Sequence, residues 1–467
     1  MAAWPGTPGG ASSPHWGPNI RLYVWVALTA GWPFTLGPHP NDRLDSGNVL
    51  SRATNPVPPG AATRGTSTGK RLWHDVTCDV VDLNVRLGAT ENDGVLARAE
   101  AATATIVLRD PDRVYDPLNP ASPWTYQGQS RLVSGVPVVV FVEVLDAGGA
   151  IRQITRFTGT ADSWLEPWTP HPAERRCRLV ASDAVKDLVA LDRGEQPAVG
   201  AGDTVDQRIA RICTYYGWPG ARVLDASTVT LQATTLAQSA WELIGRATDD
   251  EIGYTYLDAT GTLRFYNRAR WLTSPPPVIA VGCTPTPITP APHDIVVAAD
   301  AGPLDLKIRN AVYATRVGGT QQVARVQASI DRYGGIERSY KRTDLGVTDD
   351  PQAAAWANYV VGLQAWPVTQ LHTATLVPAL HPASWLDVLS VKYMTDRARV
   401  LWTPPDDPTV TYDTTARVLG VEDRVTYQRW ELTWQLTQAQ ILNRTWHLGP
   451  HRFDRLDDGN VLALTHT

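Results

Sequence analysis

The most regular pattern along the chain is an alternation of apolar and polar residues in several short segments. It runs from Val76 to Leu87, from Ala102 to Leu108 and from Cys177 to Ala181. A period of two places successive side chains on opposite faces of a β-strand. Clusters of turn-forming residues separate these segments. The sequence therefore predicts a β-barrel or sandwich over residues 70–192.

The alternation in the first of these segments changes phase once. Apolar residues occupy Val76, Cys78 and Val80, and the alternation then restarts at Val81 and continues to Leu87. A single extra residue that shifts the phase is typical of a β-bulge. We therefore expect a bulge at the Val80–Val81 step.

A helical pattern follows the predicted strands. Thr204 and Gln207 have the spacing of a capping box, an apolar stripe follows them, and Gly217 stands where a left-handed residue would end the helix. Thr235 and Gln238 repeat the spacing ahead of a second apolar stripe. The sequence thus predicts two helices that begin at these caps.

The second helix is followed by a hairpin pattern at Tyr254–Tyr266, which turns through an Asp-Ala-Thr-Gly sequence. We expect the helices and this hairpin to form a small α+β module over residues 193–275. Residues 276–294 are rich in proline and predict a linker.

A second β-rich region is expected over residues 295–445. Alternation recurs from Ala324 to Ile330 and from Trp430 to Leu436. One helix interrupts it, with Asp350 as the expected N-cap and Pro351 at the first helical position. The fold class predicted from these patterns is mainly β with an α+β insertion.

Two nearly identical segments lie at opposite ends of the chain, Leu36–Leu50 and Leu448–Leu462, and match at twelve of fifteen positions. Each has two short apolar arms around an Asp-x-Gly-Asn turn, a hairpin too short to be stable alone in water. We expect extended arms at residues 1–69 and 446–467, in which each copy docks against a protein surface. The residues expected to dock are Leu44, Val49, Leu50, Leu456, Val461 and Leu462. A recent duplication that left two surface turns is the alternative.

Composition narrows the classes of function. The chain has 467 residues and a net charge of -5, which gives no basic surface for gripping nucleic acid. Its four cysteines are far apart, which argues against a zinc site or a disulfide framework. The apolar run Leu22–Ala30 is too short for a membrane anchor. The eighteen tryptophans fit packing and subunit contacts better than sugar-binding platforms, which remain an alternative.

Three motifs are near matches to catalytic or binding sites. Gly65–Lys70 lacks one residue of a phosphate-binding loop, and Ser67 within it has nucleophile-elbow spacing but follows a Pro-rich stretch instead of a strand. A flexible linker explains both. Asp110–Asp116 brings together three carboxylates that could hold calcium, although its prolines fit a rigid turn better.

Two acidic pairs are the remaining candidates for a catalytic site. Asp249 with Asp250, and Glu242 with Glu251, can be cast as the acid and base of a glycosidase, a pairing of very low specificity in a chain with 47 acidic residues. The sequence predicts no catalytic, cofactor-binding or metal-binding residue, and no cofactor.

A family resemblance emerges from the order of the segments. The run Ala102–Trp124, a strand that leads into an Asp/Pro-rich loop, resembles the first domain of tail hub (baseplate hub) proteins of tailed bacteriophages, especially minor tail proteins of phages that infect actinobacteria. Ala240–Arg246 with the hairpin after it is similar to the middle module of that family. Leu306–Tyr313 followed by Ser329–Gly335 resembles the start of its second barrel. The resemblance covers roughly residues 70–440.

The resemblance implies two tail-tube-like β-barrels flanking the α+β module. It further implies a homotrimeric ring in the virion tail tip, assembled in the host cytoplasm, that joins the tail tube to the tip and lets DNA pass without sequence-specific binding. The implied partners are a distal tail or tube protein, a tape measure protein, and tip or receptor-binding proteins. Short Arg-Leu-Asp-x-Gly repeats also occur near the ends of such proteins.

Two features depart from the family pattern. The long N-terminal arm is extra, and the chain stops soon after the second barrel, without the peptidase or lysozyme domain that some hubs carry. We therefore expect a structural protein and not an enzyme. The alternatives are a cell-wall-degrading tail enzyme and a carbohydrate-binding receptor protein.

Overall fold

The computed structural model describes most of the chain between the two terminal arms. The described residues are 20–28, 72–88, 99–126, 128–166, 171–194, 197–272, 277–283, 293–294, 296–303, 308–366, 369–402 and 412–438. Both repeat segments, with the six residues expected to dock, lie outside the described residues, as does Gly65–Lys70. No helix in the described part is both long enough and apolar enough to cross a membrane.

Seven antiparallel strands form what we name the first β-body. Their order in space is β2 (Leu72–Asp75), β1 (Ile20–Leu28), β7 (Pro137–Leu145), β8 (Ile151–Leu165), β9 (Arg176–Ser182), β4 (Thr103–Arg109) and β3 (Val80–Gly88). The alternation in β3, β4 and β9 matches their burial, as predicted. The predicted bulge is confirmed, because the register of β3 against β4 shifts between Val80 and Asp82 and leaves Val81 as the extra residue.

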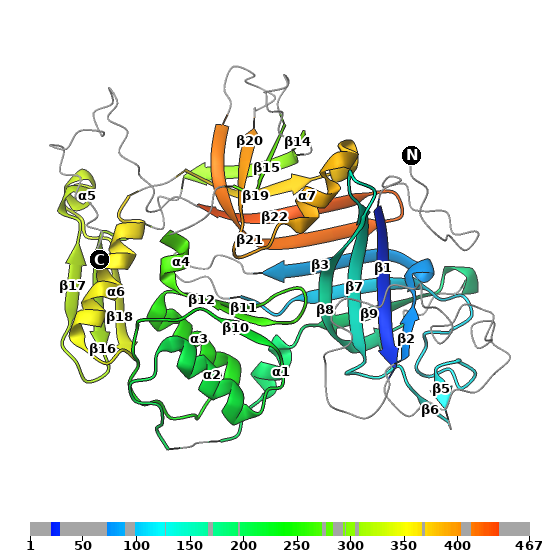
Figure 1. The fold of residues 1–467 in the computed structure, drawn as a ribbon, viewed down its shortest axis with the longest axis horizontal. Coiled ribbons are helices and arrows are strands. Elements are labelled where there is room, and N and C mark those ends of the chain that lie inside the picture. The colour runs from blue at the N-terminus through cyan, green and yellow to red at the C-terminus, as the bar shows by residue number, and fades with distance from the viewer. Residues whose placement is uncertain are drawn as a thin grey trace.

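A second group of seven strands, the second β-body, continues the same sheet. It contains β13 (Ile279–Cys283), β14 (His293–Asp294), β15 (Val296–Pro303), β19 (Thr369–Leu376), β20 (Arg397–Trp402), β21 (Tyr412–Thr426) and β22 (Trp430–Gln438). The long strand β21 pairs with β20 and β22, and its last part, Gly420–Thr426, also pairs with Asp82–Gly88 of β3. The mainly β fold class is confirmed, but no closed barrel is found among the described residues, where two tail-tube-like β-barrels were expected. The two bodies form one fourteen-stranded sheet (Figure 1), because β21 is long enough to belong to both bodies.

A buried ion pair lies at this junction. The register of β7 against β8 shifts between Val140 and Phe141, which makes Arg156 the extra residue of a second bulge. Arg156 donates to Oδ2 of Asp423 from Nε at 2.9 Å and from Nη2 at 2.7 Å, and Trp430 Nε1 donates to Oδ1 at 3.1 Å. Arg156 is 5% exposed and Asp423 is 1% exposed. A charge this deeply buried is tolerated because it is paired and hydrogen-bonded.

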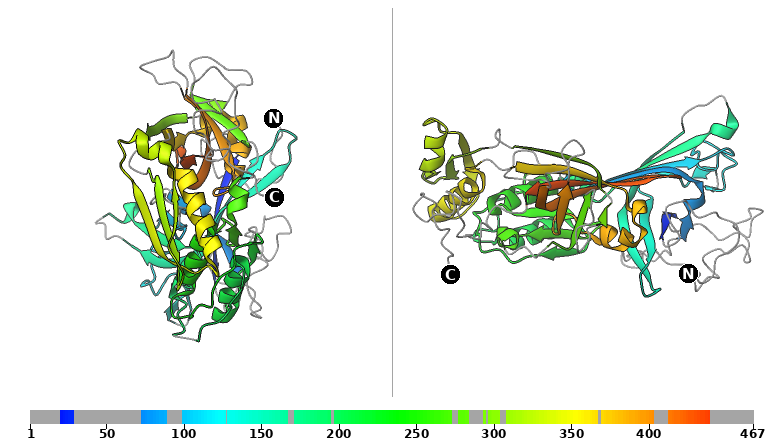
Figure 2. Two further views of the ribbon diagram at one scale, coloured as in Figure 1. Left: turned by 90° about the vertical axis from the view of Figure 1, so that its left-hand side faces the viewer. Right: turned by 90° about the horizontal axis from the view of Figure 1, so that it is seen from above.

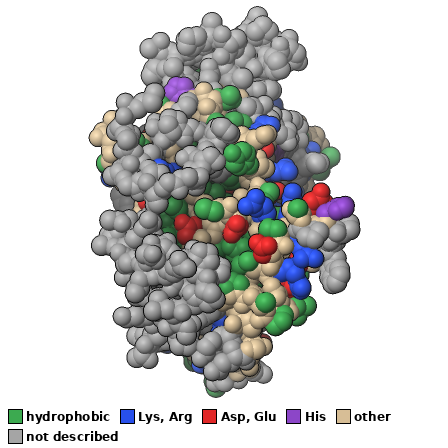
Figure 3. Space-filling view, turned by 90° about the vertical axis from the view of Figure 1, so that its right-hand side faces the viewer, with side chains coloured by type: hydrophobic (Ala, Val, Ile, Leu, Met, Phe, Trp, Pro, Cys, Tyr) green, Lys and Arg blue, Asp and Glu red, His purple; other side chains and the backbone are tan. Residues whose placement is uncertain are grey.

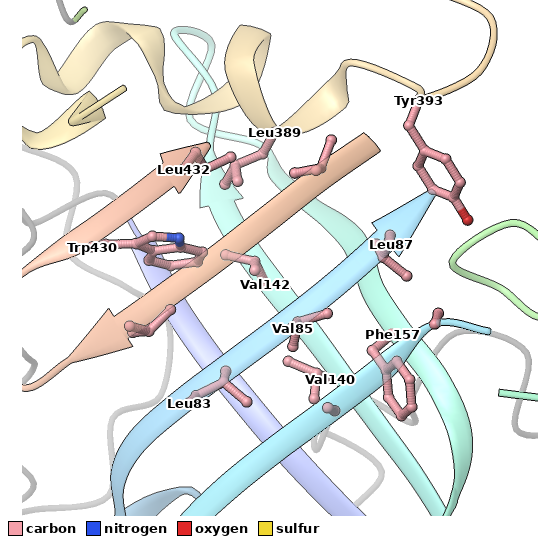
Figure 4. Close-up of a cluster of buried hydrophobic side chains, with 14 of the residues drawn as sticks. Leu83, Val85, Leu87, Val140, Val142, Phe157, Leu389, Tyr393, Trp430 and Leu432 are labelled. Carbon is pink, nitrogen blue, oxygen red and sulfur yellow. The ribbon is translucent and has the colours of Figure 1, made fainter. Parts of the chain in front are cut away.

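Apolar packing crosses the junction as well. Figure 4 shows Leu83 and Val85 of β3, Val140 of β7 and Trp430 of β22 in one group of buried side chains. These residues belong to one buried cluster that draws on strands from both bodies. The two β-bodies therefore share a hydrophobic core as well as a backbone ladder.

A separate layer, which contains most of the helices, has its own core. It contains α1 (Val185–Ala190), α2 (Val205–Tyr216), α3 (Ala240–Glu251), α4 (Arg268–Leu272), and a sheet of β10 (Arg222–Leu224), β12 (Leu263–Tyr266) and β11 (Tyr254–Leu257). The β11–β12 hairpin confirms the pattern at Tyr254–Tyr266.

Residues 308–366, which the chain inserts between β15 and β19, complete this second core. They form β16 (Ala311–Arg316), β17 (Gln322–Arg325), α5 (Gln327–Arg332), β18 (Ser339–Leu345) and α6 (Asp350–Gln364). Trp356 of α6 is fully buried, and its Nε1 donates to the carbonyl of Asp249 at 3.1 Å. The domain boundaries that the sequence predicted stay predictions. Figure 2 shows α5 and α6 at the end of the molecule away from the first β-body.

Short elements complete the fold. They are α7 (Trp385–Ser390), the hairpin strands β5 (Thr125–Tyr126) and β6 (Gln129–Ser130), and 3₁₀ turns at Thr77–Asp79, Pro172–Glu174, Pro378–Leu380 and Pro382–Ser384. Helix α7 lies on β7 and β8, and Leu389 adds to the core shown in Figure 4.

Of the three helix starts predicted from the sequence, one is confirmed and two are misplaced. The Thr204–Gln207 capping box is confirmed, and Gly217 ends α2 with φ of 70°. The predicted start at Thr235 is wrong, because Thr234 still pairs with Val199 in an extended bridge. Helix α3 begins after Ser239, whose side chain accepts the Glu242 N–H.

The start of α6 and part of one predicted strand also differ from expectation. Asp349 is the N-cap and accepts the Gln352 N–H, while Asp350 instead accepts from Arg316 and Thr320. The alternation expected up to Ile330 ends at β17, and Ile330 lies in α5. Val326 and Ile330 are four residues apart, so they fit a helical face as well as a strand.

The junction leads to a first prediction. Replacing Asp423 with alanine leaves Arg156 buried without its partner, so we expect the free energy of unfolding to fall by about 3 to 5 kcal/mol. Asp413→Ala on the same strand is the control, because its pair with Arg399 is about half exposed on both sides. Urea denaturation measures both variants. Equal effects of the two substitutions would contradict a special role for the buried pair.

Candidate functional site

The segment that carries the family resemblance ends in a loop between β4 and β5, residues 110–124, which we name the docking loop. Strands β5 and β6, which follow it, lie at the opposite end of the molecule from α5 and α6 (Figure 1). The loop begins where the pairing of β4 with β9 ends, since the Asp110 N–H donates to the carbonyl of Arg175 at 2.9 Å. Its position is therefore fixed by the sheet.

The carboxylate of Asp110 organises the first turn of the loop. It is 1% exposed and accepts hydrogen bonds from the backbone N–H groups of Val114 at 2.5 Å and Tyr115 at 3.0 Å. Burial raises the pKa of the Asp110 carboxyl, and these two N–H groups oppose that rise. The Tyr115 hydroxyl donates to Asp79 at 2.6 Å, which ties the loop to the start of β3.

Asp116 organises the tip. Its carboxylate accepts the Leu118 N–H at 2.8 Å and Nε of Arg113 at 2.9 Å. Burial acts to raise the pKa of Asp116, but the Leu118 N–H and the Arg113 guanidinium outweigh it and hold the pKa below its usual value. Arg113 itself has φ of 57°, a left-handed conformation that is costly for a residue with a side chain.

Two further side chains close the loop on itself. Asn119 Nδ2 donates to the carbonyl of Arg113 at 2.7 Å, and the Ser122 hydroxyl donates to the carbonyl of Val114 at 2.5 Å. Ser122 also accepts the Trp124 N–H at 3.2 Å. Side-chain bonds to the backbone thus replace a ladder and make the loop rigid.

The rigid loop presents one apolar side chain to solvent. Leu118, between Pro117 and Asn119, is 86% exposed, whereas Asp110, Asp116 and Ser122 around it are each under 5% exposed. Burying a leucine side chain contributes about 1.5 to 3 kcal/mol, and a preorganised loop pays little ordering entropy on binding. This geometry is suited to protein recognition.

The calcium interpretation of Asp110–Asp116 gains no support from this geometry. The carboxylates of Asp110 and Asp116 are engaged by N–H groups and an arginine, and Asp112 is exposed. Within the described residues, no group of three or more histidine, cysteine or acidic side chains is arranged to hold a metal.

The acidic pairs proposed as an acid and base separate in the structure. Asp250 accepts from Arg342 Nη2 and the Gly346 N–H, each at 3.1 Å, and Glu251 faces Arg268. Burial raises the pKa of Asp250 to about 7, and Arg342 opposes that rise. Glu242 and Asp249, by contrast, both line a cavity of about 280 Å³ beside α3.

Sequence reasoning treated the Asp/Pro-rich run as a rigid turn and missed Leu118 as its exposed tip. The signal was present in the Pro-Leu-Asn-Pro sequence, which places a leucine between two prolines. It also missed Arg156 and Asp423, which lie 267 positions apart and carry no local signal.

Comparison with known proteins identifies the fold. No family model and no curated protein sequence matches the chain. A tail protein from Neisseria meningitidis MC58 has a TM-score of 0.50 and 15% identity, over 79% of this chain and 94% of that chain. The 43 kDa tail protein of prophage MuSo2 from Shewanella oneidensis has a TM-score of 0.48 and 13% identity, over 79% of this chain and 96% of that one.

This chain has the fold of that Neisseria tail protein. The matched share, 79% of this chain, is too large for either β-body alone.

The docking loop leads to a second prediction. Replacing Asp116 with alanine removes the acceptor for the Leu118 N–H and the partner of Arg113, so the amides of residues 113–125 should exchange about tenfold faster or more. Asp112→Ala in the same loop is the control, because Asp112 is exposed. Hydrogen exchange with mass spectrometry measures both. Unchanged exchange in the Asp116 variant would show that the prolines alone hold the loop.

Proposed function

We propose that this protein is a non-enzymatic structural component of a bacteriophage tail, a hub that joins the tail tube to the tail tip. The observation that carries the proposal is the tail-protein fold, which spans 79% of this chain and 94% of the Neisseria protein. The docking loop supports it, because a rigid loop with an exposed leucine suits permanent contact with a neighbouring subunit.

In this proposal three chains form a ring. Each chain contributes two β-bodies, so three chains present six similar units toward a sixfold tube while keeping threefold symmetry toward the tip. Strand β21 supports this arrangement, since its pairing with both bodies fixes their relative orientation within each chain. The protein would lie at the virion tail tip, between a distal tail or tube protein, the tape measure protein and the tip or receptor-binding proteins of an actinobacterial phage.

We further propose that the ring lets DNA pass without binding it. The chain carries a net charge of -5, and its arginines are interspersed with acids. Figure 3 shows basic, acidic and apolar side chains mixed across the described part of one end of the molecule. A DNA-gripping surface requires clustered cations and binds with steep salt dependence. Salt-sensitive binding of double-stranded DNA in a filter assay would contradict this part of the proposal.

A third prediction tests the docking loop. Leu118→Ser should leave the melting temperature of the isolated protein unchanged, because the side chain is exposed, but should reduce its incorporation into tails at least tenfold. Ile336→Ser is the matched control, since Ile336 is 64% exposed and lies between α5 and β18. Complementation of a phage that lacks the protein, with counting of complete tails, gives the readout. An equal loss of incorporation for both variants would contradict a special role of Leu118.

A fourth prediction concerns the ring. Native mass spectrometry of assembled tail tips should give three copies per particle. Two or six copies would overturn the trimer. Assembled material is required because ring closure can depend on neighbouring tail proteins.

The cavity beside α3 is the place where a second function, an enzymatic one, can be tested. Glu242 and Asp249 line it, so a cell-wall-degrading activity would act there. A zymogram on actinobacterial peptidoglycan should show no clearing. Clearing that is abolished by Glu242→Gln would establish the enzyme instead, and specific binding on a glycan array would favour the carbohydrate-binding alternative.

A further inference from the structure

The outer face of the first β-body carries a cluster of aromatic side chains, which we name the aromatic face. It consists of Tyr23, Trp25 and Ala27 of β1, Trp73 of β2, and Val139 and Phe141 of β7. The rings of Tyr23 and Phe141 stack with centroids 4.9 Å apart. The opposite face of the same strands carries the main core, at Val24, Val26 and Val140 among others. Strands β1 and β7 are therefore apolar on both faces.

The burial of the aromatic face requires a covering layer. Phe141 is 0% exposed, Trp25 is 2% exposed and Trp73 is 9% exposed. Within the described part of the chain, every member of the cluster and the one half-buried side chain packed on it come from β1, β2 and β7. Side chains on one face of a single sheet leave their outer sides open to solvent. Rings this deeply buried need a second layer above them.

A polar group indicates what that layer must contain. Nε1 of Trp25 is buried and has no hydrogen-bond acceptor among the residues that the structure describes. A buried donor without a partner costs about 1 to 3 kcal/mol, so a layer that fits this face supplies an acceptor as well as apolar side chains.

The course of the chain limits which segment can reach the face. Strand β1 ends at Leu28 and β2 begins at Leu72, and these two residues are direct partners in the ladder. Trp25, Ala27 and Trp73 lie in this same end of the ladder. The described chain therefore stops at Leu28 and resumes at Leu72 beside the aromatic face. Leu36 follows Leu28 by eight residues, which span at most roughly 29 Å when extended.

We propose that the aromatic face is the docking site for this chain's own first repeat, Leu36–Leu50. The apolar arms of the repeat, Leu44, Val49 and Leu50, supply the covering layer, and its Asp-Ser-Gly-Asn turn supplies carboxylate and carbonyl acceptors for Trp25 Nε1. The acceptor-rich turn next to apolar arms matches both requirements of the face.

The second repeat, Leu448–Leu462, has the same arms but a different tether. It begins ten residues beyond Gln438, the end of β22, and β22 runs away from β1 in Figure 1. It therefore serves as an internal control for the first. The docking needs neither a ring nor a tail, so the isolated full-length chain is the test material.

The test is hydroxyl-radical footprinting of the full-length protein, with oxidation at Trp25 and Trp73 read by mass spectrometry. The variant Leu44→Ser/Val49→Ser should raise oxidation at both tryptophans at least threefold. The matched variant Leu456→Ser/Val461→Ser should leave it unchanged. Trp356 and Trp430, which are 0% exposed in the two cores, report whether each variant is folded.

A rescue separates loss of docking from misfolding. Adding a synthetic peptide of residues 36–50 to the first variant should restore protection of Trp25 and Trp73, and the same peptide with serine at positions 44 and 49 should not. Three results would overturn the proposal: unchanged oxidation in the first variant, an equal rise in both variants, or protection in the wild type that is lost on dilution. The last result would assign the cover to a second copy.

Discussion

The pairing of β21 with β3 is the constraint on which the rest of the molecule depends. It turns two groups of seven strands into one sheet, and the Arg156–Asp423 pair fixes its register. A slip of one residue between β21 and β3 would turn Asp423 to the opposite face, away from Arg156 of β8, and leave the two buried charges unpaired. A buried ion pair adds little net stability over an apolar contact of the same size, but it penalises every wrong alignment heavily. In this protein the pair acts on alignment more than on stability.

The same constraint reaches the docking loop. Strand β4 pairs with β3 on one side and β9 on the other, and the loop starts at the last bond of the second ladder. Because β3 is held by β21, the base of the loop is anchored to both β-bodies. The loop then keeps its shape through its own side chains, with Asp110 and Asp116 at its two turns. Leu118 is thus held at a defined place relative to the whole sheet.

Local features of the fold could be predicted from the sequence, and long-range ones could not. The bulge at Val81 and the capping box at Thr204 depend on a few neighbouring residues, so the sequence pattern was enough to locate them. The start of α3 was misplaced because a tertiary bridge at Thr234 overrides local capping chemistry. The junction itself pairs Asp82–Gly88 with Gly420–Thr426, and nothing near either segment encodes the other. For the candidate site, the turn chemistry of the docking loop was visible, but the exposure of Leu118 depends on how the whole loop folds back. The repeats were found by sequence alone, and the aromatic face by structure alone.

The long separation of β3 and β21 also has a consequence for synthesis. A ribosome adds roughly 5 to 20 residues per second, so about 15 to 70 s pass between completion of β3 and the emergence of its partner. During that time the edge of β3 is open to pairing with other nascent chains. Any chain released before residue 420 keeps this open edge and lacks the Asp423 carboxylate for Arg156. Truncated products therefore expose the unpaired edge of β3. That edge is covered only in chains that include β21.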